Sequence, residues 1–490
     1  MRHSATTLTA ACLAALILIS GCSLAPKYER PEPPTPAAWN SGDAEAGQPG
    51  AAVPDWRQVV TDAPMKRLIE LALANNRDLR VAVLNIEKAQ AQHAIKRADL
   101  FPHVDASSGA DMARTPASLS SSGLPVTSRA YSVGLGFSSF ELDLFGRIRN
   151  LKEQALEQYL STEASAKSVE LTLVAEVGQA YMTLAADREH LALAQEILET
   201  ERDSFEMVRQ RYENGIANEL DLSQAQTTVD TARVDIATYT AQVTEDENTL
   251  FLLVGAPLGP DLLPAKSLAE IQPLAEVPAG LPSEVLTRRP DILAAEHTLK
   301  AANANIGAAR AQYFPSISLT GSYGTASNAV NGLFTNGSQS WTFAPQLVLP
   351  IFHAGAIKAG VESAEADRDI YVAQYEKAIQ TAFKEVSDAL AQGSSLAAQA
   401  EAQASLTQAT GTSYDLSTLR YENGVDSYMT KLDSQRSFAT ARQSLIAVRL
   451  SQQANRLTLF KVLGGGWDGE SGPEATAPRK VAEGSSGGTS

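Results

Sequence analysis

Aromatic residues, cysteines and positive charge are all scarce in this sequence. Aromatic residues make up 6% of its 490 residues, while alanine, glutamine, serine, threonine, glutamate and leucine dominate. This composition favours long helices with small contact residues over a dense globular interior. The formal net charge is −16, which argues against a nucleic-acid partner. The length is too great for one ordinary compact core and is enough for two or three domains.

Motifs that carry catalysis or bind metals are missing as well. The six histidines are scattered, and none follows a metal-ligand spacing such as His-Glu-x-x-His. No phosphate-binding glycine loop is present. We therefore expect no enzyme, no metal site and no cofactor.

Both cysteines, Cys12 and Cys22, lie at the N-terminus. The apolar stretch from Leu8 to Ile19 is too short to span a bilayer and indicates an export signal. The residues that end it, Ile19-Ser20-Gly21-Cys22, are similar to a bacterial lipobox, in which cleavage precedes the cysteine and the cysteine is acylated. We predict lipidation at Cys22 and, because Ser23 rather than aspartate follows, sorting to the outer membrane. The alternative is an ordinary secretory signal with an incidental cysteine.

Four segments alternate apolar residues with small or polar ones, at a period of two. They run from Val104 to Met112, from Tyr131 to Phe137, from Ile317 to Tyr323 and from Trp341 to Leu349. Each is close to the length of a tilted transmembrane strand, and the alternation is typical of a barrel with lipid outside and water inside. We predict strands at about 103–114, 130–142, 316–325 and 340–350.

Long segments without proline follow each pair of predicted strands. No proline occurs from Gly146 to Gly255, and the part up to Tyr212 would be about 100 Å long as one helix. The returning segment has a heptad pattern typical of a coiled-coil seam. One row of the heptad is Val229, Ile236, Val243 and Leu250, and the adjoining row is Ala225, Ala232, Tyr239 and Leu253, interrupted by Asp246.

A short turn sequence occurs twice. Arg211-Tyr212-Glu213-Asn214-Gly215 recurs as Arg420-Tyr421-Glu422-Asn423-Gly424. Gly215 and Gly424 suit the left-handed conformation that ends a helix, and Asn218 and Ser427 are good N-cap residues for the next helix. Each copy therefore predicts the end of a helical hairpin. These turns and the pairs Phe101-Pro102 and Phe314-Pro315 each recur about 210 residues apart, which indicates an internal duplication.

These landmarks divide the chain into six parts. We expect a signal peptide at 1–21, a lipidated tether at 22–55, a first repeat at 56–256, an equatorial linker at 257–282, a second repeat at 283–463 and a disordered tail at 464–490. Each repeat is expected to contain a helix, two strands and a long helical hairpin. Four strands are too few to close a barrel, and an open sheet edge in lipid leaves backbone groups unsatisfied. Several chains must therefore pool their strands in one ring.

The chain resembles the TolC-like outer-membrane efflux channel family, in its lipoprotein branch of RND efflux systems. The resemblance covers about residues 56–464 and rests on the order and spacing of several motifs. They are the lipobox, both duplicated turns, Ala74-Asn75-Asn76-Arg77-Asp78-Leu79, Phe140-Glu141-Leu142-Asp143-Leu144-Phe145-Gly146, and Leu281-Pro282-Ser283-Glu284 with Arg288-Arg289-Pro290-Asp291-Ile292.

The resemblance implies an α+β membrane protein that forms a homotrimer. Each chain would give four strands to a twelve-stranded transmembrane β-barrel, continued by an α-helical coiled-coil tube in the periplasm and a small mixed α/β equatorial belt. The channel would sit lipid-anchored in the outer membrane and passively export drugs or other small molecules, with a periplasmic adaptor and an inner-membrane RND-type pump as partners. An exit duct for type I protein secretion and a periplasmic coiled coil without a pore are the alternatives.

The same resemblance assigns roles to residues near the turns. Asp433, with Thr430 and Tyr428, would form the pore constriction at the closed periplasmic end. Three copies of Asp433 in a narrow space would resist full ionisation and favour cations. A solvated Asp433 is the alternative. The turns at Gly215 and Gly424 would contact the adaptor, a role compatible with helix capping.

A gating latch between neighbouring hairpin ends is also implied. Asp221 and Tyr421 match two positions of the family's latch, whereas Asp426 stands where the family has its gating arginine. Asp426 cannot pair with Asp221, so a hydrogen bond from Tyr421 to Asp221 is the expected latch. Local helix capping by Asp221 is the alternative.

Overall fold

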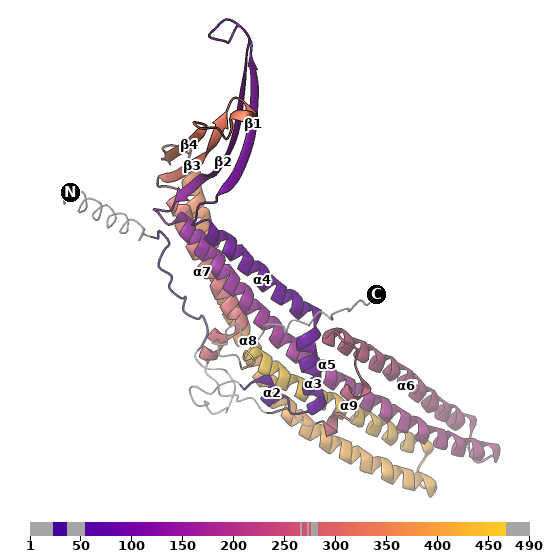
Figure 1. Cartoon of the computed structure of the whole chain (residues 1–490). Coiled ribbons are helices and arrows are strands. Elements are labelled where there is room, and N and C mark those ends of the chain that lie inside the picture. Colours follow the sequence, from indigo (N-terminus) through magenta and orange to yellow (C-terminus); the bar gives the residue numbers. More distant parts are fainter. Residues whose placement is uncertain (1–22, 37–53, 265–266, 272–273, 276–282, 467–490) are drawn as a thin grey trace, which may run out of the picture. The chain divides into compact units, whose positions relative to one another are not determined.

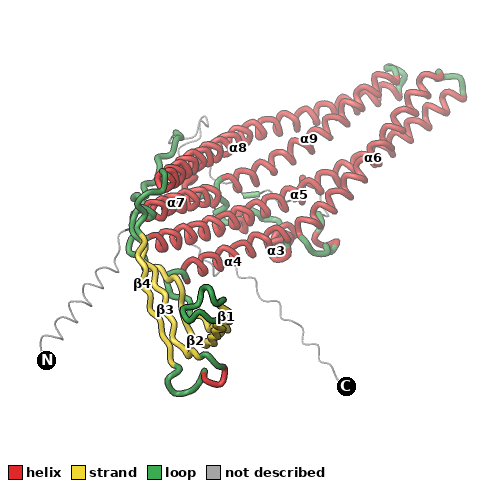
Figure 2. The backbone as a smooth tube through the Cα atoms, turned by 90° about the horizontal axis from the view of Figure 1, so that it is seen from above, coloured by secondary structure: helices red, strands yellow, loops and turns green. Residues whose placement is uncertain are grey.

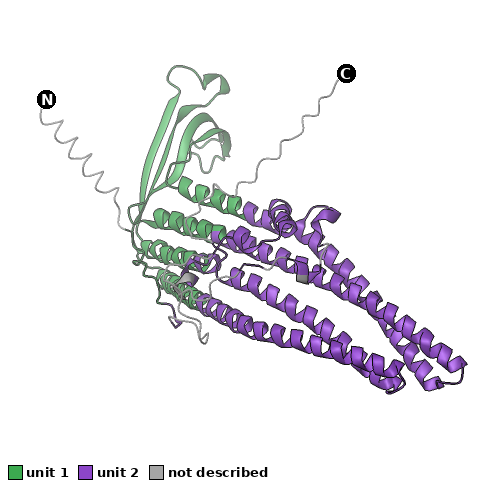
Figure 3. Ribbon diagram, turned by 90° about the horizontal axis from the view of Figure 1, so that it is seen from below, with its two compact units in different colours: residues 1–32, 85–163, 294–376 green, residues 33–84, 164–293, 377–490 purple. Residues whose placement is uncertain are grey.

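A computed structural model describes residues 23–36, 54–264, 267–271, 274–275 and 283–466. The predicted signal peptide, Cys22 and residues 467–490 of the predicted tail lie outside this range. The chain divides into two compact units (Figure 3). Unit 1 comprises residues 1–32, 85–163 and 294–376, and unit 2 comprises residues 33–84, 164–293 and 377–490. Both repeats of the sequence contribute to each unit.

Helices account for most of the described chain (Figure 1). They are α2 (Trp56–Val59), α3 (Ala63–Asn75), α4 (Arg77–Ala98), α5 (Arg147–Glu213), α6 (Glu219–Val254), α7 (Pro290–Ala311), α8 (Ala356–Glu422) and α9 (Tyr428–Val462), with short 3-10 helices η1 (Pro260–Leu262), η2 (Leu268–Glu270), η3 (Ser283–Arg288) and η4 (Val330–Gly332). Among the described residues, no helix combines the length and the apolar character that crossing a membrane requires.

Unit 1 contains a four-stranded antiparallel sheet (Figure 2). Its strands are β1 (Asp105–Thr115), β2 (Val126–Leu142), β3 (Ser316–Ser327) and β4 (Gln339–Val348), paired in the order β1-β2-β3-β4. Each strand begins and ends within four residues of its predicted bounds. The hairpins β1-β2 and β3-β4 come from the two repeats and are joined by the pairing of β2 with β3.

The register places the apolar side chains of all four strands on one face of the sheet. Residues directly opposite each other in an antiparallel pair point to the same face, and Leu135, Tyr323 and Trp341 are matched in this way. The apolar face holds Ala106, Ala110, Met112, Tyr131, Val133, Leu135, Phe137, Phe140, Leu142, Ile317, Leu319, Tyr323, Trp341, Phe343, Pro345 and Leu347. The opposite face is made mostly of small or polar residues, with Val126 and Val348 as its larger apolar side chains.

A β-bulge keeps this face continuous. The pairing of β2 with β3 shifts between Phe137 and Phe140, where Ser139 has a φ of 56° and its N–H donates to Thr320 Oγ1 at 3.2 Å. One extra residue reverses the direction of every side chain that follows it. Without the bulge Phe140 and Leu142 would point to the polar face, so the irregularity preserves the separation of the faces.

The apolar face is uncovered in the single chain. Trp341 is 73% exposed, and Tyr323 and Leu347 are each 63% exposed. Large apolar side chains gathered on one exposed surface mark contact with a membrane or another protein.

The two long predicted helices are present, and one other prediction needs correction. α5 and α8 have 67 residues each and end at the duplicated turns. The single helix expected ahead of the strands in the first repeat is instead divided at Asn76 into α3 and α4. The Asn76 side chain accepts from Leu79 N–H at 2.9 Å and donates to Leu253 O at 2.8 Å. It therefore starts α4 and ties this corner to the end of α6, a contact far away in sequence.

The residues after Cys22 bind to unit 1 instead of forming a free tether. Ser23 Oγ donates to Asn150 Oδ1 at 2.8 Å, and Asn303 Nδ2 donates to Pro26 O at 2.8 Å. Further along, Arg30 forms two hydrogen bonds, at 3.0 and 2.7 Å, with the carboxylate of Glu296, whose side chain is 2% exposed. A buried carboxylate requires such partners, so this segment is part of the fold.

Unit 2 has its own polar anchor at Arg289. This side chain is 9% exposed and pairs with Asp291 at 2.7 Å and with Glu385 at 2.9 Å. It also donates to Val462 O at 2.7 Å. One guanidinium thereby joins the start of α7, the middle of α8 and the end of α9, which explains why the motif around Pro290 has its charges at these positions.

The close contact between β2 and β3 predicts a strong effect of Gly324→Ala. An added Cβ would lie 2.2 Å from Val133 O and 2.5 Å from Gly134 Cα, so the backbones must move apart. We expect a loss of about 1–3 kcal/mol, seen as a lower thermal midpoint of the β signal in circular dichroism. Gly109→Ala is the control, because its added Cβ meets only Ser132 Oγ at 3.5 Å. Equal midpoints for the two variants would contradict this account of the sheet.

Candidate functional site: the paired hairpin ends of unit 2

The two duplicated turns have the same backbone structure. Gly215 and Gly424 each have a φ of 73°, in the left-handed region that glycine tolerates. In the first turn Gly215 N–H donates to Tyr212 O at 2.9 Å and Ile216 N–H donates to Arg211 O at 2.9 Å. The second turn repeats both bonds at 3.0 and 2.9 Å. This pair of bonds is the Schellman motif, which ends a helix after its last turn.

The next helices begin at the predicted cap residues. Asn218 Oδ1 accepts from Asp221 N–H at 2.9 Å, and Ser427 Oγ accepts from Thr430 N–H at 3.3 Å. Capping of α6 is therefore performed by the Asn218 side chain, while Asp221 supplies only its backbone N–H. In the described part of the chain the Asp221 carboxylate caps no helix end, which leaves it available for another contact.

An apolar cluster joins the two hairpins just behind the turns. Val208, Ala225, Tyr421, Tyr428 and Leu432 are buried in it, and Phe205 and Leu222 pack against it. The rings of Tyr421 and Tyr428 lie 5.6 Å apart. Residues from α5, α6, α8 and α9 all contribute, so the two hairpin ends share one core.

Tyr428, Thr430 and Asp433, the residues expected at the pore constriction, differ in burial in the single chain. The Tyr428 side chain is only 6% exposed and packs within the shared core. Thr430 and Asp433, by contrast, are exposed on α9. The position of Tyr428 at the first turn of α9 places it in the same cluster as Val208 of α5 and Ala225 of α6.

A buried polar network lies beside this core. Lys431 is 4% exposed and its Nζ donates to Ser204 Oγ at 3.0 Å, while Glu201, also 4% exposed, accepts from Thr228 Oγ1 at 2.7 Å. Burial lowers the pKa of Lys431. Burial also raises the pKa of Glu201, although the Thr228 hydrogen bond and the charge of Lys431 oppose this shift. Both shifts show that the two hairpins enclose opposite charges away from water.

Arginines on the rim add contacts at the same end. Arg420 donates to both carboxylate oxygens of Asp426, at 2.7 and 2.9 Å, and these bonds lower the pKa of Asp426. The guanidinium of Arg211 lies 4.8 Å from the ring centre of Tyr421. Asp426 therefore pairs within its own turn, which agrees with the expectation that it does not bind Asp221.

The structure brings together most of the residues singled out in the sequence. Gly215, Gly424, Asp221, Tyr421 and Thr430 all lie at or near the hairpin ends, with Asp433 one turn further along α9. Within the described residues no hydrogen bond joins Tyr421 to Asp221, so a latch between these residues of one chain is not formed here. An added Cβ at either glycine would meet nothing within 4 Å, so both turns are open to a partner.

The buried pair of Lys431 and Glu201 was missed in the sequence. The signal available was spacing, because Lys431 stands three residues after Tyr428 and four before Gln435 on one helix face. Charged residues are normally assigned to solvated faces, so a pattern of apolar residues alone does not identify a buried lysine or glutamate.

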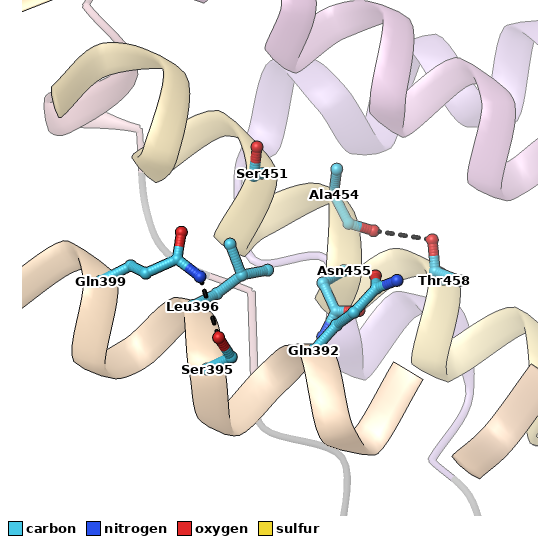
Figure 4. A pocket seen from close by; sticks show the side chains of 8 residues that line it. All are labelled: Gln392, Ser395, Leu396, Gln399, Ser451, Ala454, Asn455 and Thr458. Atoms are coloured by element: carbon cyan, nitrogen blue, oxygen red, sulfur yellow. Dashed lines mark hydrogen bonds between the residues drawn. The ribbon is translucent and has the colours of Figure 1, made fainter. Parts of the chain in front are cut away.

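A groove between α8 and α9 is a separate feature of unit 2 (Figure 4). It has a volume of about 400 Å³ and is lined by Gln392, Ser395, Leu396, Gln399, Ser451, Ala454, Asn455 and Thr458. Its lining carries hydroxyl and amide groups and no formal charge. The groove lies part-way along the second hairpin, and none of its lining residues belongs to the polar network of Lys431 and Glu201.

Comparison with known proteins gives consistent matches along the chain. A family model described as "Outer membrane efflux protein" matches residues 68–256 and 281–465. The chain is 47% identical over 459 residues to a probable efflux pump outer membrane protein, TtgC of Pseudomonas putida, covering 93% of this chain and 95% of TtgC.

Solved structures agree with these sequence matches. A membrane protein from Pseudomonas aeruginosa has a TM-score of 0.86 and 42% identity, covering 91% of this chain and 98% of the other. The open state of the Neisseria gonorrhoeae MtrE outer membrane channel has a TM-score of 0.82 and 36% identity, again covering 91% and 98%.

The buried network predicts that Lys431→Ala destabilises the hairpin ends. The substitution removes packed methylene groups and one of the two positive charges, Lys431 and Arg436, that act on Glu201, for an expected cost of about 3 kcal/mol. A lower thermal midpoint and faster hydrogen exchange around both turns would report it. Lys358→Ala is the control, because the Lys358 side chain is 75% exposed, and it should change stability by less than about 0.5 kcal/mol. Similar effects of the two substitutions would show that Lys431 does not stabilise the junction.

Proposed function

Because the chain belongs to the outer membrane efflux protein family, we propose that it is the outer-membrane channel of a tripartite efflux system, through which drugs or other small molecules leave the cell passively. The observation that carries this proposal is the separation of faces in the sheet of unit 1. Sixteen positions, from Ala106 to Leu347, present apolar or aromatic side chains to one side, and the other side is mostly small or polar. Lipid outside and water inside impose this division.

The sheet supports a barrel built from three copies. β1 and β4 each pair with one neighbour in the described chain, so each has a free edge. In hydrocarbon a free edge costs several kcal/mol for each unsatisfied backbone group. Pairing β4 of one copy with β1 of the next removes both edges. Three copies then give a barrel of twelve strands, within the range of bacterial barrels.

The helices supply the periplasmic tube of this proposal. α5 and α8, with 67 residues each, would span about 100 Å. The heptad of α6 packs as a seam, since Ala225, Val229, Ala232 and Leu250 are buried in the single chain. In contrast, Ala366 and Ala373 on α8 are exposed, as expected of small residues that meet a neighbouring copy. The shorter elements around α2, η1 and η2 would form the equatorial belt.

The open turns are the proposed contact for a periplasmic adaptor, behind which an inner-membrane RND-type pump supplies the energy. Ile216 is 76% exposed and Val425 is 61% exposed, each directly after its glycine. Covering an apolar side chain at the tip of a hairpin removes it from water, which stabilises the complex with the partner. The names of the relatives favour this arrangement over a type I secretion duct, because TtgC is described as an efflux pump component.

Cys22 is the proposed lipid anchor of the channel. The segment that follows it begins at Ser23, which is held to Asn150 close to the start of α5. That position directly follows β2, the end of the membrane strands. Several acyl chains on one residue give a stable anchor.

Asp433 and Thr430 are the proposed constriction, and Tyr421 and Asp221 the proposed latch between copies. Exposure of Asp433 on α9 is compatible with a position facing a channel. The Asp221 carboxylate, which caps no helix in its own chain, is available to accept a hydrogen bond from Tyr421 of a neighbouring copy.

The proposed function predicts a change in drug susceptibility. A host that lacks its own outer-membrane efflux channel should become less susceptible to several drugs when this chain is produced together with its adaptor and pump. The minimum inhibitory concentrations are the measurement, and the chain produced without the pump is the control. Protein in the outer membrane with no change for any compound, together with secretion of a protein substrate, would favour the type I alternative.

The constriction predicts altered conduction in Asp433→Ala. Removing three carboxylates from a narrow passage should raise the single-channel conductance and weaken cation selectivity. Planar bilayer recordings of the purified protein give both quantities. Asp230→Ala is the control, since Asp230 is an exposed acid on α6 paired with Arg233. Unchanged conductance and selectivity in Asp433→Ala would place this residue on a solvated outer surface.

A further inference from the structure

The seam between α5 and α6 contains an acid where the heptad calls for an apolar residue. Asp246 continues the row of Ala225, Ala232 and Tyr239, and Leu250 follows it one turn later with no exposed area. Its Oδ2 is enclosed and has no hydrogen-bond partner. Asp246 as a whole is half-buried, but this oxygen has neither water nor a hydrogen bond, which disfavours the ionised form of the carboxyl group.

The group that Asp246 meets across the seam is another acid. Asp187 on α5 lies within hydrogen-bonding range of the Asp246 carboxyl. Ionised carboxylates only accept hydrogen bonds, so two of them form such a bond only when one retains a proton. Asp187 is flanked by Leu184, Ala185 and Ala186, which are buried, so little water reaches this side of the pair.

Nearby cations are occupied elsewhere. Arg188 donates to Glu247 Oε1 at 2.6 Å and to Pro264 O at 2.6 Å. On α3, which also contacts α6, Arg67 lies 4.0 Å from Asp261. The charges that act on Asp246 come from Asp187 on α5 and Glu245 on α6, and both are negative.

His190, one turn beyond Asp187, does not supply the missing positive charge. Its ring stacks on Tyr239 with centroids 5.0 Å apart, and its Nδ1 is buried without a partner. Burial lowers the pKa of His190 despite the neighbouring acids Asp187 and Glu189. Burial therefore disfavours the charged imidazole, so His190 is a poor source of positive charge for the two carboxyl groups.

We propose that Asp187 and Asp246 share one proton across the α5–α6 seam, and that loss of this proton loosens the first hairpin at this point. The pair is a proton-binding site that makes the packing of α5 against α6 depend on pH. This inference concerns the packing of one hairpin and is independent of transport, so its failure would leave the proposed channel function untouched.

The titration falls near neutral pH. Burial, followed by the hydrogen bond and the charge of Asp187, raises the pKa of Asp246 to about 7. Because this pKa is raised above that of the unfolded chain, the site stabilises the packed seam fully only below about pH 4, where an aspartate of the unfolded chain is also protonated. The stabilisation is lost as the pH rises through about 7. Acidification therefore tightens the hairpin, and alkalinisation introduces two like charges into it.

Infrared spectroscopy of the purified full-length protein tests the shared proton directly. A carboxylic acid band should be present at about pH 6 and lost by about pH 8, when ordinary aspartates are ionised throughout. Glu201 also has a raised pKa, so the spectra are compared in a Glu201→Gln background. In that background Asp246→Asn should remove the band and Asp230→Asn should retain it. A band that survives in Asp246→Asn, or its absence from the parent at about pH 6, would overturn the proposal.

Thermal unfolding supplies a second measurement. The midpoint of the wild-type protein should fall by a few degrees between about pH 6 and about pH 8. In Asp246→Asn and Asp187→Asn, whose amides can donate to the remaining carboxylate, this fall should be largely lost. Asp246→Leu, which restores the apolar row, should leave a higher midpoint than wild type at about pH 8. Wild-type pH dependence in either asparagine variant would contradict the shared proton, so the test still holds if the other variant is too unstable to purify.

Discussion

A backbone amide or carbonyl without a hydrogen-bond partner costs several kcal/mol in hydrocarbon. This cost is the main constraint on the sheet of unit 1, because the sheet has two open edges. β1 and β4 each have one neighbour in the described chain, and the face that carries Trp341 and Tyr323 is uncovered. A sheet of this kind is stable in a membrane only when its edges are closed by further strands. The proposed ring of three copies follows from this requirement.

The register of the sheet depends on a single irregular residue. Ser139 adopts a positive φ and shifts the pairing of β2 by one position, so that Phe140 and Leu142 rejoin the apolar face. The bulge disrupts the pairing of β2 with β3 locally, but it keeps the apolar side chains of β2 on one face of the sheet. The close approach of Gly134 and Gly324 serves the same pairing, because no side chain separates the two backbones there.

At the hairpin ends of unit 2, apolar packing and buried charge act together. The shared core around Tyr421 and Leu432 joins both hairpins, and Lys431 with Ser204 and Glu201 adds polar contacts that are satisfied in one arrangement only. Hydrophobic contacts tolerate sliding of one helix against another, whereas a buried lysine that loses its partner is expensive. The network therefore defines how the hairpins are aligned, and the exposed turns present Gly215 and Gly424 beyond it.

Local patterns determined much of this protein. The alternation in four segments defined the strands and their apolar sides, the absence of proline defined α5 and α8, and Gly215 and Gly424 defined the turns, since each of these signals acts within a few residues along the chain. Tertiary structure alone decided the rest. Asn76 divides a helix because its partner is Leu253 O, and Tyr428 is buried because α5 and α6 cover it. Asp246 meets Asp187 because two helices pair in one register. Such contacts join residues far apart in sequence, and their energies depend on burial that no local pattern specifies.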